Sequence, residues 1–304
     1  MVDETKNSSP QRDKTVVALG TFDGVHRGHQ ELLKRTAELA RKRGLRSLAH
    51  TYELPPRVHL GEKEDFEAKL LLPPDRKLEL LREYVEEAMV ERFGRIRELE
   101  PRAFIEKILL GELRARAVVV GRDWRFGKNR AGDVEDLRSI GEESLSVMAI
   151  EPIEEKGEAI SSTRIRRALK EGQMELAGRM LGRPPELRGK VTRGEGLGRK
   201  LGFPTANLAV DERLVQPGEG IYAARTEVKN RLYRSVFYVG TRPTIDDKSL
   251  RLEVHLLDGF NGSIYGERIT VYPLVRLGGG RDYRSRAELR RAIEGFVQRA
   301  KEVL

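Results

Sequence analysis

The pattern of hydrophobic and polar positions changes once along the chain, at the Gly-Arg-Pro-Pro run of residues 182–185. Before this run, short β-rich apolar stretches alternate with segments whose apolar residues recur every three or four positions, the spacing of an amphipathic helix. The expected strands are residues 15–20, 46–52, 114–121 and 144–152, and the expected helices are residues 29–44, 75–85, 101–111 and 161–172. Such alternation predicts a doubly wound α/β domain with a parallel sheet.

After residue 185 the pattern becomes one of short strands separated by glycine and proline turns. The expected strands are residues 187–193, 220–228, 232–240, 250–258 and 267–277, followed by one amphipathic helix from about residue 285 to the end. This pattern predicts a small antiparallel β-barrel with a terminal helix. We therefore expect a flexible polar tail at residues 1–14, a first domain at 15–184 and a second at 185–304.

Composition narrows the class of protein. The 304 residues include no cysteine, which excludes disulfides and thiolate metal sites. No apolar stretch is long enough to span a bilayer and the N-terminus lacks a hydrophobic signal core, so we expect a cytoplasmic protein without a membrane partner. The net charge of +9 is spread along helices among 48 acidic residues, so we expect no nucleic-acid partner. Oligomeric state is left open.

Residues 20–29, GTFDGVHRGH, join an expected strand to an expected helix. The first N–H groups of a helix have no partners within it, and the helix dipole favours negative charge there, so a phosphate fits this junction. His26 and His29 are three residues apart and can face one anion, while Gly24 lets the backbone approach closely. A turn followed by two surface histidines would give the same letters, but the flanking strand and helix favour a nucleotide site.

Residues 161–166, SSTRIR, supply a second candidate phosphate contact. The hydroxyls and helix-start amides of Ser162 and Thr163, with the guanidinium of Arg166, suit phosphate oxygens. Taken alone, the segment would more simply be a serine cap on an ordinary helix.

Together the two segments resemble the HxGH and STxxR motifs of the Rossmann-like nucleotidylyltransferases. The FDGxHxGH form is similar to that of the prokaryotic bifunctional riboflavin kinase/FAD synthetases. The resemblance implies catalytic roles for His26, His29 and Arg166. It also implies ATP contacts at the matching positions Gly20, Phe22, Asp23, Gly24, His26, His29, Ser162, Thr163 and Arg166.

Residues 118–133 run from the end of a buried strand into a glycine-rich loop. The spacing rejects a P-loop, because five residues separate Gly121 from Gly127 and Asn129 replaces the required Ser or Thr. The loop resembles the family's GxDFxFGxxxxGD segment, which contributes to the flavin site. The implied flavin contacts are Asp123, Trp124, Phe126 and Gly127, and either aromatic residue could instead belong to the core.

Residues 196–208, GLGRKLGFPTANL, resemble the flavokinase signature GRxLGFPTANL. Gly196 and Gly198 suit backbone approach to ATP phosphates, and the oxygens of Thr205 and Asn207 suit ATP-bound Mg²⁺. A glycine turn entering a strand would explain the glycines, but not the order Pro-Thr-Ala-Asn.

Phosphorylating a primary alcohol needs a base beside the hydroxyl. Residues 252–258, LEVHLLD, alternate like a half-buried strand and match the segment that carries the family's catalytic glutamate, here Glu253. The commoner role for such a glutamate is a salt bridge at a strand edge. Residues 240–245 and 265–271 resemble two further flavokinase segments.

Two segments depart from the family pattern. Residues 52–60 lack the histidine between prolines, and residues 276–283 keep Arg276, an implied flavin contact, but insert glycines. The resemblance implies Mg²⁺-dependent synthesis of FMN from riboflavin and ATP, then of FAD and pyrophosphate from FMN and ATP. The alternatives are a relative with only one of these activities and a basic, non-catalytic protein that binds ATP and RNA.

Overall fold

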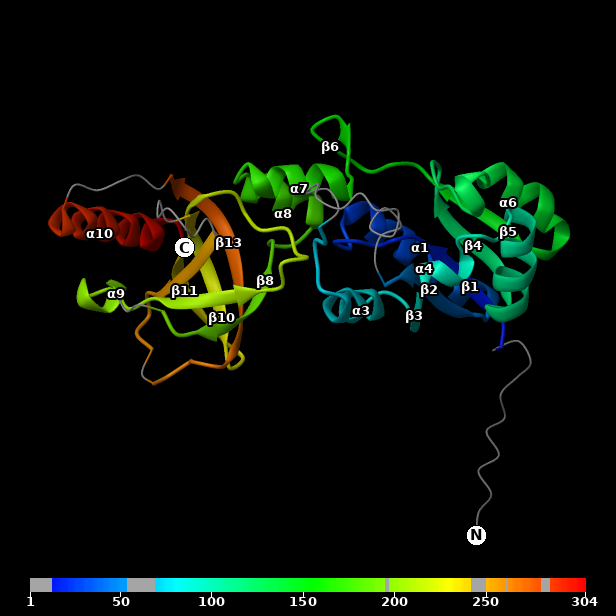
Figure 1. Ribbon diagram of the computed structural model, residues 1–304. Coiled ribbons are helices and arrows are strands. Elements are labelled where there is room, and N and C mark those ends of the chain that lie inside the picture. The colour runs from blue at the N-terminus through cyan, green and yellow to red at the C-terminus, as the bar shows by residue number, and fades with distance from the viewer. Residues whose placement is uncertain (1–12, 54–68, 195–196, 242–249, 261, 280–284) are drawn as a thin grey trace, which may run out of the picture. The chain divides into compact units, whose positions relative to one another are not determined.

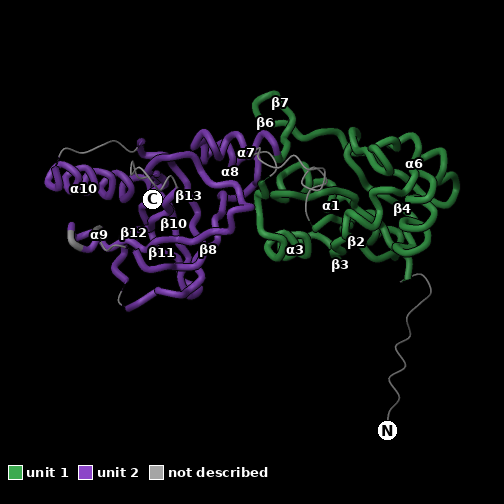
Figure 2. The backbone as a smooth tube through the Cα atoms, viewed as in Figure 1, with its two compact units in different colours: residues 1–162 green, residues 163–304 purple. Residues whose placement is uncertain are grey.

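The computed structural model describes residues 13–53, 69–194, 197–241, 250–260, 262–279 and 285–304. The chain forms two compact units, residues 1–162 and residues 163–304, which are considered separately below (Figure 2). The tail predicted at residues 1–14 lies almost wholly outside the described residues.

The first unit contains a five-stranded parallel sheet with strand order β3-β2-β1-β4-β5 (Figure 1). Its strands are β1 (Thr15–Leu19), β2 (Arg46–Tyr52), β3 (Glu87–Glu91), β4 (Ala115–Gly121) and β5 (Ser146–Ile150). The central strand β1 is buried along its whole length, as expected for a strand covered on both faces. The predicted doubly wound α/β fold is confirmed.

Side chains of β1 alternate between two cores. Val16 and Ala18 pack toward helices α1 (Arg27–Arg43) and α3 (Pro74–Arg82). Val17 lies in the opposite core with the π-helix η2 (Phe104–Glu112) and helix α6 (Val134–Gly141). Helices thus cover both faces of the sheet and leave the carboxyl ends of its strands to the loops that carry the candidate site.

The predicted helix ends differ from the observed ones by a few residues. Helix α1 begins at Arg27 rather than His29, and it ends as expected at Gly44, which has a φ of 65°. Helix α3 begins at Pro74, one residue before the predicted start at Asp75. The remaining elements of the unit are α4 (Phe93–Ile96), α5 (Pro101–Ala103), η3 (Lys128–Arg130), η4 (Glu142–Ser144), β6 (Glu154–Glu155) and β7 (Glu158–Ala159).

The second unit contains a closed six-stranded barrel with strand order β10-β11-β12-β9-β8-β13, and every pairing within it is antiparallel. The strands are β8 (Leu187–Thr192), β9 (Ala206–Val210), β10 (Gly220–Val228), β11 (Arg231–Thr241), β12 (Leu250–Leu256) and β13 (Arg268–Gly278). Buried Tyr222, Phe237 and Val254 fill its interior. The predicted barrel is confirmed, and its strand β9 was not predicted from the sequence.

The helices described alongside the barrel are α7 (Ser162–Lys170), α8 (Met174–Leu181), α9 (Leu197–Lys200) and α10 (Arg286–Val303). Helix α10 is the predicted terminal helix, and the Ser285 hydroxyl caps it by accepting the N–H of Glu288 at 3.1 Å. Helix α8 packs against β13. The predicted domain boundary at residue 184 stays a prediction. The two compact units divide after residue 162, at the start of helix α7.

Candidate active sites

The loop between β1 and α1 holds the histidine pair of the sequence motif. His26 is the N-cap of α1, and its Nδ1 accepts the backbone N–H of His29 at 3.4 Å. This bond requires an unprotonated Nδ1, so the neutral imidazole of His26 carries its proton on Nε2.

The two histidine rings lie together, as the three-residue spacing predicts. Their centroids are 3.6 Å apart with an angle of 19° between the planes, and the Phe22 ring meets His29 edge-on at 5.2 Å. His26 is buried, and a Cβ on Gly28 would come within 3.3 Å of its ring. The stack at the start of a long helix offers N–H donors and a positive dipole end, which together suit a phosphate.

The other residues predicted to bind ATP in this loop are largely buried. Phe22, Asp23 and Gly24 form a tight turn closed by a bond from the Val25 N–H to the Phe22 carbonyl at 3.1 Å. Gly20 needs its lack of a side chain, because a Cβ there would lie 3.1 Å from the Phe22 ring. These residues shape the loop rather than line an open surface.

The second predicted phosphate motif meets this loop at its first residue. The Ser162 hydroxyl donates to the main-chain oxygen of Asp23 at 2.9 Å. Thr163 and Arg166 follow in helix α7, where Arg166 is fully buried. A guanidinium is rarely buried without a partner, and Arg166 is not without one.

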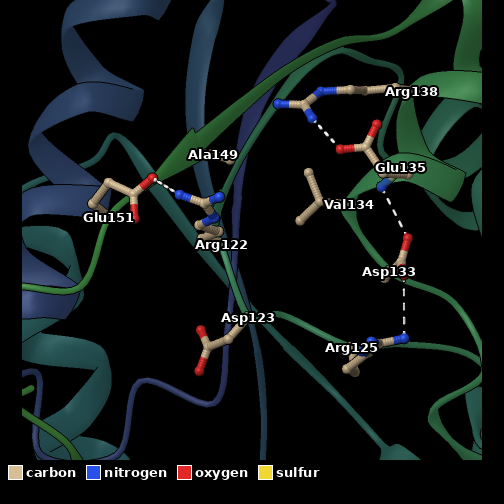
Figure 3. A pocket seen from close by; sticks show the side chains of 9 residues that line it. All are labelled: Arg122, Asp123, Arg125, Asp133, Val134, Glu135, Arg138, Ala149 and Glu151. Atoms are coloured by element: carbon tan, nitrogen blue, oxygen red, sulfur yellow. Dashed lines mark hydrogen bonds and ion pairs between the residues drawn. The ribbon is translucent and has the colours of Figure 1, made fainter.

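A cavity of about 450 Å³ opens beside the predicted flavin segment, at the carboxyl ends of β4 and β5 (Figure 3). Most of its lining is charged, and ion pairs join Arg122 to Glu151, Arg125 to Asp133 and Arg138 to Glu135, at N···O distances of 2.5, 3.2 and 2.5 Å. Asp123 also lines the cavity, apart from these pairs in Figure 3. Ligands of open α/β sheets bind at this end of the strands.

The two aromatic residues of the same segment are stacked, with centroids 4.8 Å apart and 13° between the ring planes. Phe126 is buried against Phe104 and packs in the core, which was the alternative interpretation of this residue. Trp124 is half-buried and keeps surface for contact with a planar ligand. Gly127 has a φ of 74°, a conformation that glycine adopts without strain.

In the barrel, the structure brings the Pro-Thr-Ala-Asn segment and the predicted base together. The Thr205 hydroxyl donates to Oε2 of Glu253 at 3.0 Å, although 48 residues separate them. Asn207 lies directly opposite Glu253 in the register of β9 and β12. Leu252 and Val254 point into the barrel, so Glu253 lies on the outer, half-buried face.

Polar side chains lie beside Glu253 on that face, since Thr205 donates to it and Asn207 is its register partner on β9. His255, two residues further along β12, has its Nδ1 within 2.9 Å of the Pro204 carbonyl, and its ring meets Phe203 at 5.6 Å. Contacts with β12 thus hold the Pro-Thr-Ala-Asn segment before Thr205, through Phe203 and Pro204, and after it, through Asn207.

The glycines before this segment lie close to its functional atoms. A Cβ on Gly198 would lie 2.3 Å from the Phe203 carbonyl and 3.0 Å from the Thr205 hydroxyl. A Cβ on Gly194 would lie 2.0 Å from the Asn207 side-chain nitrogen. Gly196 is outside the described residues.

Arg276 lies at a different part of the barrel from the residues around Glu253. It is opposite Tyr222 in the register of β10 and β13, and its Nη2 donates to the Glu219 carbonyl at 2.8 Å. A Cβ on Gly172 would lie 2.7 Å from its Cδ. The hydrogen bond ties Arg276 to the residue before β10, and none of these contacts joins Arg276 to Thr205, Asn207 or Glu253.

Family comparison gives the two halves different matches. A model described as FAD synthetase matches residues 8–164, and a model described as riboflavin kinase matches residues 181–304. The chain belongs to the bifunctional riboflavin kinase/FMN adenylyltransferase family. Both expectations drawn from the motifs, the family and its two-domain fold, are confirmed.

Curated relatives of the family align over most of the chain. The bifunctional riboflavin kinase/FMN adenylyltransferase of Listeria monocytogenes is 36% identical over 84% of this chain and 82% of its own length. That of Pseudomonas fluorescens is 35% identical over 97% and 94%. A crystal structure described as a macrolide-efflux protein from Streptococcus pneumoniae superimposes with a TM-score of 0.86 at 33% identity, covering 97% and 95% of the two chains.

No helix in the described part of this chain is long and apolar enough to cross a bilayer. Nor do the described residues include a group of three His, Asp or Glu side chains placed to hold a metal ion. The departures at residues 52–60 and 276–283 fall largely outside the described residues.

Lys77 and Glu91, two of the buried polar groups of the first unit, were not predicted from the sequence. Lys77 of α3 is only 6% exposed, and Glu91 at the end of β3 is equally buried beside His50 and Arg95. The position of Lys77, three and four residues before buried Leu80 and Leu81, places it on the core face of α3 and could have indicated its burial.

Proposed function

We propose that this chain makes FAD in two steps in the cytosol. The barrel unit phosphorylates riboflavin with ATP to give FMN and ADP, and the sheet unit transfers AMP from a second ATP to FMN, releasing pyrophosphate. The observation that carries the proposal is the 3.0 Å hydrogen bond from Thr205 to Glu253, which unites the nucleotide-binding segment with a carboxylate base. Membership of the bifunctional family supports the same pair of reactions.

In the first step Glu253 accepts the proton of the terminal ribityl hydroxyl. The hydroxyl oxygen forms a bond to the γ-phosphorus of ATP while the bond from that phosphorus to the β–γ bridging oxygen breaks, and ADP leaves. A base must lie within hydrogen-bond reach of the hydroxyl, and the outer face of β12 leaves Glu253 accessible for this role. The Thr205 hydroxyl fixes the orientation of the carboxylate.

The same cluster fits a magnesium ion that also carries ATP oxygens. Thr205, Asn207 and Glu253 offer a hydroxyl, an amide oxygen and a carboxylate, the hard oxygen ligands that Mg²⁺ prefers. Thr205 and Asn207 are the residues that would hold it. When bound, the ion neutralises charge on the phosphates during transfer.

In the second step a phosphate oxygen of FMN bonds to the α-phosphorus of ATP, and the bond from that phosphorus to the α–β bridging oxygen breaks. No covalent enzyme nucleophile is required, so the protein orients the reactants and stabilises the developing charge. His26 and His29, stacked at the start of α1, are assigned to the ATP phosphates, with Ser162, whose hydroxyl is bonded to the same loop. For Thr163 and Arg166 the ATP contact remains what the STxxR resemblance implies.

Flavin contacts are assigned to the cavity beside β4 and β5. Asp123 lines this cavity, whereas Trp124, Phe126 and Gly127 are not among its lining residues. Half-buried Trp124, next to Asp123 in the chain, is assigned to the ring system as an aromatic face. Phe126 and Gly127 are assigned to shaping the loop. Phe126 is buried against Phe104, and Gly127 has a positive φ.

Single substitutions separate the two activities. Glu253→Gln should abolish FMN formation from riboflavin and leave conversion of added FMN to FAD unchanged, whereas His29→Ala should do the reverse. The matched controls are Glu212→Gln and Lys34→Ala, which change exposed side chains in the same units. Loss of both activities in either folded variant would contradict two independent sites.

A further inference from the structure

Lys77 is a buried cation below the β1–α1 loop. Its Nζ lies 2.5 Å from the carbonyl oxygen of Tyr52 and 3.4 Å from that of Thr21. Tyr52 is the last residue of β2, and Thr21 is the second residue after β1. One ammonium group therefore donates to the ends of two neighbouring strands.

These carbonyls lie just beyond the last ladder bond between the strands. That bond runs from the Gly20 N–H to the His50 carbonyl at 3.2 Å, and past it the two chains separate toward different loops. The Thr51 hydroxyl also donates to the Thr21 carbonyl, at 2.9 Å. Lys77 and Thr51 thus replace the missing ladder contacts where the loop begins.

The loop itself is held in an unfavourable backbone conformation. Phe22, Gly24 and Val25 have φ values of 48°, 84° and 40°. Positive φ is unfavourable for a β-branched residue such as Val25 and persists only where the surroundings enforce it. The enforcing bonds include the Leu71 N–H to the Asp23 carboxylate at 3.0 Å.

Burial and nearby charge act on Lys77 in opposite directions. Burial lowers its pKa to about 8, against the attraction of the Asp23 and Glu53 carboxylates, which raises it. The group therefore remains mainly protonated at neutral pH and loses its charge above about pH 8. Neutral lysine offers one fewer N–H and no charge to the two carbonyls.

We propose that Lys77 is a positioning residue for adenylyl transfer, whose ammonium group holds the Thr21 and Tyr52 carbonyls together and so fixes the loop that presents His26 and His29. Lys77 acts through the backbone and touches neither ATP nor FMN. The inference rests on the function proposed above for the first unit.

The first test compares Lys77→Met with Arg82→Met, which removes an exposed positive charge from the same helix. A small displacement of catalytic groups lowers the reaction rate strongly. Because Lys77→Met should displace the loop that carries His26 and His29, we expect it to lower kcat/KM for FMN adenylylation by about tenfold or more. Arg82→Met should not, and riboflavin phosphorylation should be unchanged in both variants. Equal adenylylation in the two variants would overturn the proposal.

The second test uses the absence of cysteine from the chain. Lys77→Cys can be alkylated with bromoethylamine in denaturant and refolded, which rebuilds a lysine-like side chain with sulfur in place of one methylene, and wild-type protein taken through the same steps is the control. Adenylylation should return, and its decline at alkaline pH should move to lower pH, because sulfur lowers the amine pKa.

The outcomes separate this inference from the proposed function. A wild-type chain that makes no FAD from FMN refutes the function of the first unit, and the inference with it. Two outcomes with normally active wild-type protein refute only the role of Lys77. In one, the alkylated Lys77→Cys protein does not regain adenylylation. In the other, it regains adenylylation but its activity declines at the same alkaline pH as that of wild type. If Lys77→Met does not fold, the alkylated Lys77→Cys protein still decides the question.

Discussion

The buried carboxylate of Glu91 gives a prediction whose size follows from the structure. Its Oε2 lies 2.6 Å from Nη2 of Arg95 and 3.7 Å from Nε2 of His50. The nearby His50 imidazole and then the hydrogen-bonded Arg95 guanidinium lower the pKa of Glu91 from 4.5 to about 2. Because the folded-state pKa is depressed, the stabilisation is complete above pH 4.5 and is lost as the pH falls toward 2.

The free energy involved is moderate. A fall in pKa from 4.5 to about 2 corresponds to at most about 3 kcal/mol. The Arg95 side chain is half-exposed, so solvent weakens part of this interaction and we expect about 2 kcal/mol. Glu112 accepts a hydrogen bond from the same guanidinium at 2.7 Å but is itself half-exposed, which makes it the matched control.

Urea unfolding followed by tryptophan fluorescence measures this contribution, since Trp124, the single tryptophan, belongs to the first unit. At neutral pH, Glu91→Gln should lower the free energy of unfolding by about 2 kcal/mol and Glu112→Gln by under about 1 kcal/mol. The difference should shrink as the pH is lowered below 4.5. Equal unfolding midpoints for the two variants at neutral pH would refute the reasoning.

Three further predictions concern single positions. Gly198→Ala should slow FMN formation by about tenfold or more while sparing FAD formation, because its Cβ would lie 2.3 Å from the Phe203 carbonyl; unchanged riboflavin kinetics would contradict this. FMN should quench Trp124 fluorescence, and a titration without quenching would exclude contact with the ring. Since burial lowers the pKa of Lys77 from 10.5 to about 8, the unfolded chain binds more protons between these values. Rising pH there should therefore stabilise wild-type protein relative to Lys77→Met in urea unfolding, while adenylylation declines.

The fold could be predicted wherever hydrophobic residues repeat with one period, that of a strand or that of a helix, along a long segment. Strand β10 has the predicted bounds, and β12 alternates buried Leu252 and Val254 with half-buried neighbours. Strand β3 was missed because it lies at the sheet edge, where Met89 and Val90 are exposed and give no alternation. Its pairing with β2, rather than its own residues, makes it a strand.

Some residues of the candidate sites could also be predicted from the sequence, and others could not. The motif residues His26 and His29 lie close together because one helix start fixes their spacing, and strand pairing brings Glu253 to Asn207. Lys77 could not be assigned a role from its own segment, since its partners are main-chain oxygens of two distant strands. Contacts to backbone atoms have no counterpart in a side-chain motif.

The central claim is that one chain carries out both steps, and a time course of purified protein with riboflavin, ATP and Mg²⁺ tests it most directly. Products are separated and quantified at each time, with a parallel sample lacking Mg²⁺. The account predicts that FMN appears first, that FAD follows as FMN is consumed, and that neither forms without the metal ion. Absence of both products, or FMN that never becomes FAD, would contradict it.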